Sequence, residues 1–491
     1  MTASVSVIHY IGIILVFLII LLVGIRSGKS IKSINEFSGK ARTAGLGIIS
    51  GTIIGTIVGG ASTIGTAQLA YTNGFSAWVF TLGSGIGLII MAVFYSKKLY
   101  NSECKTLPQY IEKEYGKTAG RFVTMLNSLG SFLSIVSQIM SGTALLITFI
   151  VIITGNLNVN TIIVVASAII SVIFMMVYVT FGGMVGAGLV GIVKTVLLYV
   201  GMAICGIMAI TMQEGGYAGF VSTLGGLDTE YFSLIGRGFW TDGGKILSLI
   251  LGVLTTQTYI QALISGRSLR MSRISVSISA VFVAAMGIPG ILVGMYMRVN
   301  CSDLVGENAI LALPLFILKY VPALPAGIII GTLLIAAVGT GAGVVLGLST
   351  MIYNDIYIQL FKKEYLNPRK ALLVSRLIIV IVLSLTCIVA IPMIILKAQV
   401  QDISTLSMAL RGAAAFMALF GALFLTGKLR KEYAIISIIA TPLLVLFSKP
   451  FIPEGIDSLW VGFVFSAAVM VIGLIFSKYY HKNHQSGDNV S

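Results

Sequence analysis

The 491-residue chain has few charged side chains. Asp, Glu, Lys and Arg make up 10% of it, apolar residues make up 57%, and the mean hydropathy is +1.01. So little polar surface cannot cover a soluble globule of this length. The scarcity of charge excludes a soluble protein and indicates one that is embedded in lipid.

The sequence also lacks the alternation of apolar and polar residues that is typical of barrel strands. Its apolar runs continue for roughly 20 residues, the length of helix that crosses ~30 Å of hydrocarbon. We therefore predict an all-α membrane protein. The start of the chain has no basic region and no small-residue cleavage site, so we expect no cleaved signal.

Cysteine and histidine are scarce as well, with four and three residues. Cys205 and Cys387 fall inside apolar runs, whereas Cys104 and Cys301 fall in loops with opposite charge character. This scatter predicts neither a disulfide framework nor a metal centre. No nucleophile with a nearby base and no spaced His, Cys and Glu set stands in the apolar runs, so we expect no enzyme.

The apolar runs predict about thirteen membrane spans with short loops. No soluble domain is expected, because the loops reach only a few tens of residues and the tail is a short polar stub. The predicted spans lie near residues 6–26, 46–72, 75–96, 120–153, 159–180, 184–212, 246–266, 274–298, 324–360, 371–396, 403–426, 432–448 and 457–477.

The charge of the loops provides a separate test of this division. The net charge of +15 comes from Lys and Arg concentrated in every second loop, which is the distribution that membrane topology requires and not a nucleic-acid surface. The basic loops are predicted to be cytoplasmic, so the amino terminus is outside and the carboxyl terminus inside. The basic residues are Lys29, Lys32, Lys40, Arg42, Lys97, Lys98, Lys105, Lys113, Lys117, Arg121, Arg267, Arg270, Arg273, Lys362, Lys363, Arg369, Lys370, Lys428, Arg430, Lys431, Lys478 and Lys482.

Two predicted spans contain residues that weaken a membrane helix. The second span is rich in Gly, Ser and Thr over 45–65, and the seventh contains the polar run Thr255-Thr-Gln-Thr-Tyr-Ile-Gln261. Small residues can serve close helix packing, whereas a discontinuous helix would line a binding cavity near the midplane. Because the two spans are five apart, they fit an inverted repeat with spans 2–6 and 7–11 as its halves. This pattern indicates a transporter.

Several stretches resemble the sodium/solute symporter family, which contains bacterial proline, sialic acid and sugar symporters. The resemblance covers spans one to eleven. The matching stretches are Ile64-Gly-Thr-Ala-Gln-Leu-Ala-Tyr71 with Gly74, Thr106-Leu-Pro-Gln-Tyr-Ile111, Phe181-Gly-Gly-Met184 and Asn354-Asp-Ile-Tyr357.

The resemblance implies the leucine-transporter-type fold with 5+5 inverted repeats. It divides the single transporter domain, 1–491, into a first span and loop (1–45), a first repeat (46–212), a second repeat (240–426) and two last spans with the tail (427–491). A solute would lie between spans two, four, seven and eleven. With the basic loops, the family favours a prokaryotic plasma membrane.

The family's sodium site is incomplete in this sequence. The resemblance maps its hydroxyl pair in span nine onto Gly339 and Thr340, and its acidic position in span six onto Gly191. The carbonyls of Gly55, Val58 and Ala336 could still contribute oxygens. Sodium prefers several oxygen ligands, so without a carboxylate its binding would be weaker.

All 17 Asp and Glu residues fall in loops or at span ends, whereas two basic residues fall well inside apolar runs. Lys194, in span six, could extend to the cytoplasmic surface or could occupy the space of the missing sodium near Thr340. We favour the second interpretation, which some proton-coupled carriers of this fold exemplify. Burial favours the neutral form of an ammonium, so Lys194 could exchange a proton in the working pH range.

Arg411, in span eleven, is the second buried cation. Its guanidinium could bind a substrate carboxylate, form part of an outer gate or bond helix-end carbonyls. Neutral polar groups on the three other site helices complete the candidate solute site, although Ser and Thr often bond their own backbone. These candidates are Ser62, Ser134, Ser137, Gln138, Thr255, Thr256, Gln257 and Gln261.

The sequence thus predicts a secondary transporter that carries a small anionic or zwitterionic solute by alternating access. Lys194 makes it proton-coupled or uncoupled, with no cofactor. The first alternative is an ordinary sodium symporter that uses Thr340 and backbone carbonyls, and the second is a membrane sensor that kept the transporter fold. The expected partners are the solute and the lipid bilayer, not nucleic acid.

Overall fold

The structure is a computed structural model that describes residues 6–28, 42–102, 104, 106–154, 160–181, 184–225, 229–358 and 368–487. Within these ranges the chain is helical, and its one β-bridge joins Ala44 to Gly266. Some residues used in the sequence analysis lie outside the described ranges. They are Lys29, Lys32, Lys40, Lys105, Gly182, Gly183, Asp228, Lys362 and Lys363.

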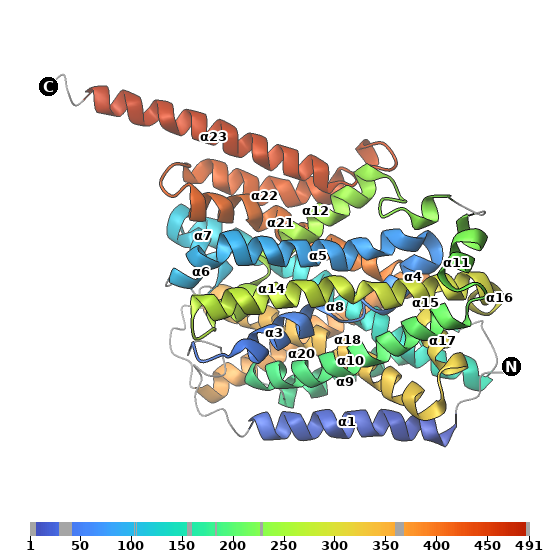
Figure 1. Cartoon of the computed structure of the whole chain (residues 1–491). Helices are drawn as coiled ribbons and strands as arrows, with labels where there is room; N and C mark the ends of the chain where they lie inside the picture. Colours follow the sequence, from blue (N-terminus) through green and yellow to red (C-terminus); the bar gives the residue numbers. More distant parts are fainter. Residues whose placement is uncertain are drawn as a thin grey trace.

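The helices alternate in direction across the bundle (Figure 1). They are α1 (Val7–Gly28), α3 (Leu46–Ile57), α4 (Ile64–Asn73), α5 (Val79–Ile90), α6 (Ser96–Asn101), α7 (Leu107–Tyr115), α8 (Lys117–Thr154), α9 (Thr161–Phe181), α10 (Met184–Met212), α11 (Gly216–Gly225), α12 (Phe239–Thr255), α13 (Gln257–Ile264), α14 (Leu269–Ala285), α15 (Gly287–Asn300), α16 (Ser302–Val305), α17 (Ala312–Tyr320), α18 (Ala323–Met351), α20 (Pro368–Ile395), α21 (Val400–Phe424), α22 (Lys431–Phe447) and α23 (Leu459–Gly487).

Where the structure describes them, the thirteen predicted ranges each coincide with one helix or with consecutive helical segments. Within the described ranges, eight helical stretches are long and apolar enough to cross a membrane, and the bent pair α12 and α13 makes nine. The remaining ranges hold shorter apolar helices, such as α3, the first half of the broken second span. The exact number of spans therefore stays a prediction.

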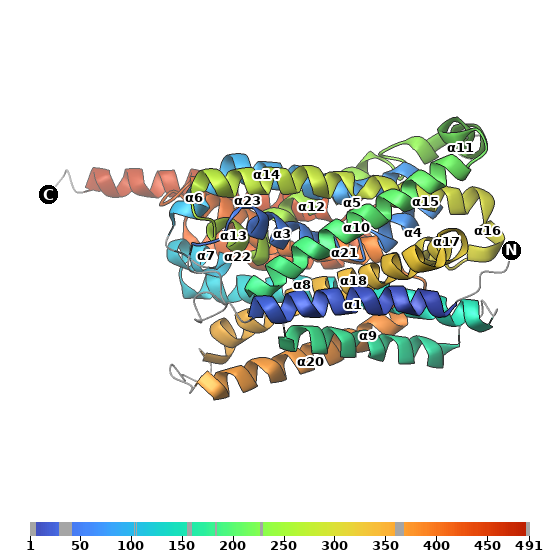
Figure 2. The same cartoon turned by 60° about the horizontal axis from the view of Figure 1, so that its bottom comes forward.

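The long helices lie roughly parallel, with α1 at one edge of the bundle and α23 at the opposite edge (Figure 1). A turned view shows α9 and α20 together on another side (Figure 2). We call the end of the bundle that holds the start of α1 the outer end, after the orientation predicted from loop charge. The end that holds α6 and α7 is the inner end.

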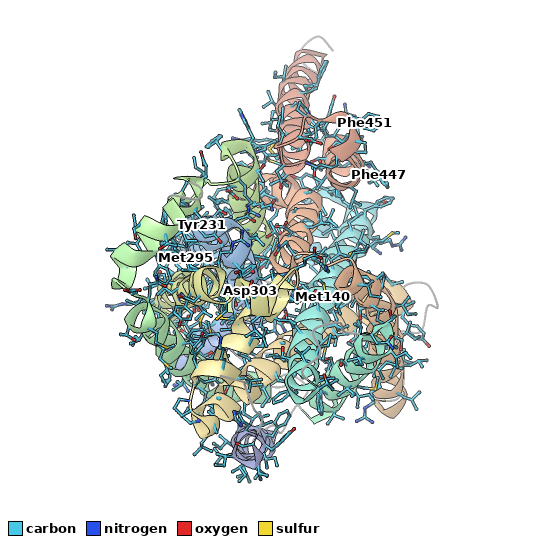
Figure 3. The ribbon with its side chains drawn as sticks, turned by 90° about the vertical axis from the view of Figure 1, so that its right-hand side faces the viewer. Met140, Tyr231, Met295, Asp303, Phe447 and Phe451 are labelled. Atoms are coloured by element: carbon cyan, nitrogen blue, oxygen red, sulfur yellow. The ribbon has the colours of Figure 1, made fainter. Side chains whose placement is uncertain are left out.

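Helix α8 occupies the centre and packs against both α18 and α21. In a view along the helices, Met140 of α8 lies inside the bundle, whereas Phe447 and Phe451 lie at its edge (Figure 3). Met140 is fully buried and Phe451 is 85% exposed. Gln138 and Ser141 of α8 lie beside Gly60, in the segment between α3 and α4.

Both predicted breaks are present. Between α3 and α4, residues 58–63 leave the helical path, beginning with the extended backbone of Val58. Helices α12 and α13 meet at Thr256 with a bend of 48°. At the first break a side chain on Gly60 would overlap Ser141 of α8, so only glycine fits there.

Helices α3 and α10 cross at a glycine contact. A Cβ atom on Gly191 would lie 2.7 Å from the carbonyl oxygen of Gly51, and one on Gly55 would lie 3.1 Å from the Cα atom of Gly191. Because these distances leave no room for side chains, the two backbones approach closely. An acidic residue at position 191, which the family pattern would supply, does not fit this packing.

We predict that Gly191→Ala destabilises the protein and that Gly47→Ala does not. Overpacking costs about 1–3 kcal/mol, which exceeds the gain of up to about 1 kcal/mol from replacing a helical glycine. Gly47 of α3 is a matched control because a Cβ atom on it would meet the side chain of Ile192 on α10 at 3.6 Å, an ordinary contact. Thermal unfolding in detergent tests this, and equal melting temperatures for the two variants would contradict it.

Candidate functional site

The break between α3 and α4 exposes backbone groups that find partners inside the bundle. The amide of Gly59 donates to Ser62 Oγ at 3.0 Å, and the amide of Gly60 donates to Gln138 Oε1 at 2.9 Å. Ser62 Oγ in turn donates to the carbonyl of Gly59. Unpaired amides in lipid would each cost several kcal/mol. Ser62 and Gln138 therefore stabilise the break.

Lys194 lies at the centre of α10 and is 2% exposed. Its ammonium donates to the carbonyl of Gly55 at 2.5 Å and to Thr340 Oγ1 at 3.2 Å. Thr340 also donates to the Gly55 carbonyl, at 3.2 Å. The side chain runs into the bundle, so the ammonium lies between two of the groups that the resemblance assigns to sodium.

The other predicted members of this ion site lie close by in the sequence. Ala336 and Gly339 belong to the turn of α18 that precedes Thr340. Val58 follows α3 and its amide donates to the carbonyl of Ile54 at 2.7 Å. The site thus joins the end of α3, the middle of α10 and the middle of α18.

Arg411 of α21 is 3% exposed and bonds only neutral groups among the described residues. Its guanidinium donates to Thr256 Oγ1 at 3.1 Å, to Ser407 Oγ at 2.9 Å and to the Ser407 carbonyl at 3.3 Å. It also approaches the sulfur of Met408 at 3.3 Å. The five ion pairs that the described residues form include neither Arg411 nor Lys194.

A narrow cavity connects the region of Arg411 with that of Thr340. Its volume is about 20 Å³, which is room for about one water molecule. An organic solute would need the surrounding helices to separate. The lining residues are Thr56, Ile57, Phe80, Ser134, Gln138, Thr256, Thr258, Tyr259, Thr340, Val344, Ser404, Met408 and Arg411.

Five residues predicted from the sequence line this cavity, and several others have different contacts. Ser137 and Thr255 donate to backbone carbonyls of their own helices. Gln257 accepts the amide of Leu107 at 2.7 Å, at the inner end, and Gln261 lies one turn further along α13. The five that line the cavity are Ser134, Gln138, Thr256, Thr340 and Arg411.

Some lining residues were not predicted from the sequence. Ser404 and Met408 precede Arg411 by seven and three residues on α21, so helical periodicity from the buried arginine indicates their face. Tyr259 stands within the polar run 255–261, which indicates its region but not its direction, whereas Phe80 stands in an apolar run with no signal that separates it from ordinary core residues.

The outer end above the cavity is closed by two glutamines. Gln68 of α4 donates to the carbonyl of Ala398 at 3.2 Å and accepts the amide of Val400 at 3.0 Å. Gln401 of α21 donates to Thr66 Oγ1 at 3.1 Å. We call this set of bonds the outer seal. It joins α4 to the start of α21.

Towards the inner end the cavity is less enclosed. Thr56 of α3, Thr258 of α13 and Val344 of α18 all line it and are partly exposed. The structure is therefore closed on the outer side and partly open on the inner side.

The sequence and the fold were compared with known proteins. The sodium:solute symporter family model matches residues 41–439. The chain is 26% identical over 394 residues to the human high affinity choline transporter 1, covering 75% of this chain and 65% of that protein. It is 22% identical to the Drosophila melanogaster high-affinity choline transporter 1 over 77% of this chain and 61% of that one. The chain thus spans under two thirds of these relatives.

A bacterial relative aligns over nearly its whole length. The sodium/sialic acid symporter SiaT of Proteus mirabilis is 23% identical over 479 residues, which are 93% of this chain and 92% of that protein. Among solved structures, the substrate-bound outward-open state of a Na+-coupled sialic acid symporter superposes with a TM-score of 0.75, 19% identity and coverage of 96% and 97%.

These comparisons confirm the predicted all-α, leucine-transporter-type fold. They also show a multi-pass membrane protein. With four fifths of its length matched by one family model, the chain belongs to the sodium:solute symporter family.

Proposed function

We propose that this protein carries a small anionic or zwitterionic organic solute by alternating access, with Lys194 in place of the family's sodium ion. The observation that carries the proposal is the position of the ammonium, 2.5 Å from the Gly55 carbonyl and 3.2 Å from Thr340 Oγ1. Transport would then be coupled to protons, or uncoupled if Lys194 keeps its proton throughout the cycle.

The charged lysine competes directly with sodium. Two unit charges 4 Å apart repel each other by about 4 kcal/mol at an effective dielectric constant of 20. That energy weakens binding about a thousandfold. The ammonium also donates a hydrogen bond to the Gly55 carbonyl, whose oxygen would otherwise be available as a sodium ligand.

Exchange of a proton on Lys194 would change how three helices are joined. The protonated group links α10 to α3 through Gly55 and to α18 through Thr340. A neutral amine has one fewer donor and no charge, so both links weaken. Burial without a carboxylate partner favours the neutral form, which makes this exchange feasible.

Sodium coupling is the second candidate, because part of the family's site is present. Thr340 Oγ1 and the Gly55 carbonyl are 3.2 Å apart, and Ala336 and Val58 lie near them along the chain. A sodium ion could bind them once Lys194 is neutral and turned away. The sodium coupling of the sialic acid relatives supports this candidate.

We also propose the orientation in which the amino terminus is outside a bacterial plasma membrane. Lys98, Arg267 and Arg273 lie at the inner end of the bundle, where Arg273 donates to Ser96 and Lys98 to the Leu423 carbonyl. Concentrated Lys and Arg mark the cytoplasmic side. The extended match to a bacterial symporter supports the same location.

We predict that an inward proton gradient, and not a sodium gradient, drives uptake into proteoliposomes. A carboxylate solute found by thermal-shift screening would accumulate faster at lower outside pH, because protonated Lys194 is the loaded form. Lys194→Ala should remove the response to pH while downhill exchange of the solute continues. Lys428→Ala, in an exposed loop, is the matched control. Sodium-driven uptake that Lys194→Ala leaves intact would contradict the proposal.

We predict further that Gln401→Ala opens the outer side. The substitution removes the bond to Thr66, one of those that join α4 to α21, so the outward-open state becomes more populated. A Ser404→Cys reporter in a background without the four native cysteines should react faster with an impermeant thiol reagent added outside. Gln109→Ala, an exposed glutamine at the inner end, should leave the rate unchanged. Equal rates for both variants would contradict a sealing role.

A further inference from the structure

We infer that the solute is a monocarboxylate without a positive charge of its own, and that one proton moves with it, so that a transport cycle carries no net charge. This inference rests on the proposed function and narrows its substrate class. It is based on the charges that line the cavity and on the number of titratable groups inside the described spans.

The cavity has one charged lining residue, the cation Arg411. All other lining groups are hydroxyls, one amide, one phenol or apolar side chains. Lys194 adds a second positive charge behind Thr340, to which it donates at 3.2 Å. None of the described carboxylates pairs with either cation. A bound carboxylate would therefore supply the missing counter-charge for Arg411.

A zwitterion or a cation would add positive charge to a site that already has an excess of it. The ammonium of an amino acid is two bonds from its carboxylate carbon, so it would lie close to the guanidinium that binds the carboxylate. No lining residue is acidic, so the ammonium would find neutral hydroxyl and amide acceptors and the rings of Phe80 and Tyr259, but no counter-charge. The site thus favours an anion over an amino acid of the same shape and over choline.

The neutral lining groups suit a compact body with hydroxyl groups. Gln138, Ser134 and Ser404 provide hydrogen-bonding groups, whereas Ile57 and Phe80 provide an apolar wall. A buried polar group that loses its partner weakens binding, so each hydroxyl of the solute would contribute to selectivity. Hydroxylated monocarboxylates fit this combination.

Lys194 is the one charged residue of α10. The same helix also carries Tyr199, which donates to the Phe282 carbonyl, and Cys205, and both side chain types are uncharged near pH 7 in water. Helices α3 and α18, which pack against α10, contain no titratable residue. The other neighbours carry such groups only near their ends. These are His9, Tyr10 and Arg26 on α1, Tyr217 on α11, and Tyr296 and Arg298 on α15.

One proton site and one carboxylate site fix the charge balance. The loaded carrier would move with Lys194 protonated and with the carboxylate on Arg411, and it would return with Lys194 neutral and Arg411 empty. The proton contributes +1 and the carboxylate −1, so their sum is zero. A membrane potential would then neither drive nor oppose the cycle.

The substrate class can be tested with pairs of acids that differ only at one group. The probes are lactate and alanine, 2-hydroxyisocaproate and leucine, phenyllactate and phenylalanine, with choline as the cation. We expect at least one hydroxy acid to bind the purified protein saturably and at least tenfold more tightly than its amino partner. Arg411→Gln should weaken that binding at least tenfold, and Arg411→Lys should weaken it less. Arg270→Gln, an exposed control, should leave it unchanged.

The result that would overturn the substrate class is an amino acid or choline that binds as tightly as the hydroxy acids. Binding of none of the hydroxy acids, or binding that Arg411→Gln leaves intact, would overturn it as well. These outcomes concern the solute alone. They do not depend on which ion drives transport.

The charge balance can be tested in proteoliposomes with the hydroxy acid that binds best. We expect a pH dye to report one proton taken up per solute molecule, and we expect no current on a supported membrane. The rate of uptake should change less than twofold under a potassium diffusion potential of either sign. Proton-dependent uptake with a steady current would overturn this inference and leave proton coupling intact. Sodium-driven uptake would overturn the proposed function and leave the substrate class intact.

Discussion

The constraint on which the rest of the structure depends is that a membrane helix can break only where its freed backbone groups find partners. At the first break, Gly59 and Gly60 bond Ser62 and Gln138, and the Gly55 carbonyl accepts from Lys194 and Thr340. Ser62 lies in the break itself, and the other partners come from α8, α10 and α18, so the break joins these three helices. Thr340, which bonds the Gly55 carbonyl, also lines the cavity, so the proposed ion site and the cavity are adjacent.

A second feature is that two buried positive charges have no negative partner among the described residues. Lys194 and Arg411 are almost fully buried, and the ion pairs of the described residues lie instead near the ends of helices, as in the contact of Lys245 with Asp402 at 2.5 Å. Burying a cation without a partner is costly and marks a functional site in a membrane protein. One cation lies where the family resemblance implies the ion and the other lines the cavity, so we propose a different function for each.

Sequence reasoning anticipated the features that follow from chemistry along one helix. The glycines of the second span predicted its break, the lack of a mid-span carboxylate indicated Lys194, and the family resemblance implied its neighbour Thr340. It could not separate Thr256, which lines the cavity, from Thr255, which does not. Both hydroxyls donate to carbonyls of α12, and one residue along a helix changes the direction of the side chain by about 100°. Nor could it predict that Gln257 reaches Leu107, 150 residues away.

Direct measurement of sodium binding tests the central claim, that an ammonium has taken the place of sodium. The measurement is a scintillation proximity assay of radioactive sodium with the purified protein in detergent. The assay is run at a pH at which Lys194 is charged. The account predicts no saturable binding to the wild type up to about 100 mM, since charge repulsion weakens the site about a thousandfold. Saturable millimolar binding that Thr340→Val abolishes would show a working sodium site and contradict the account.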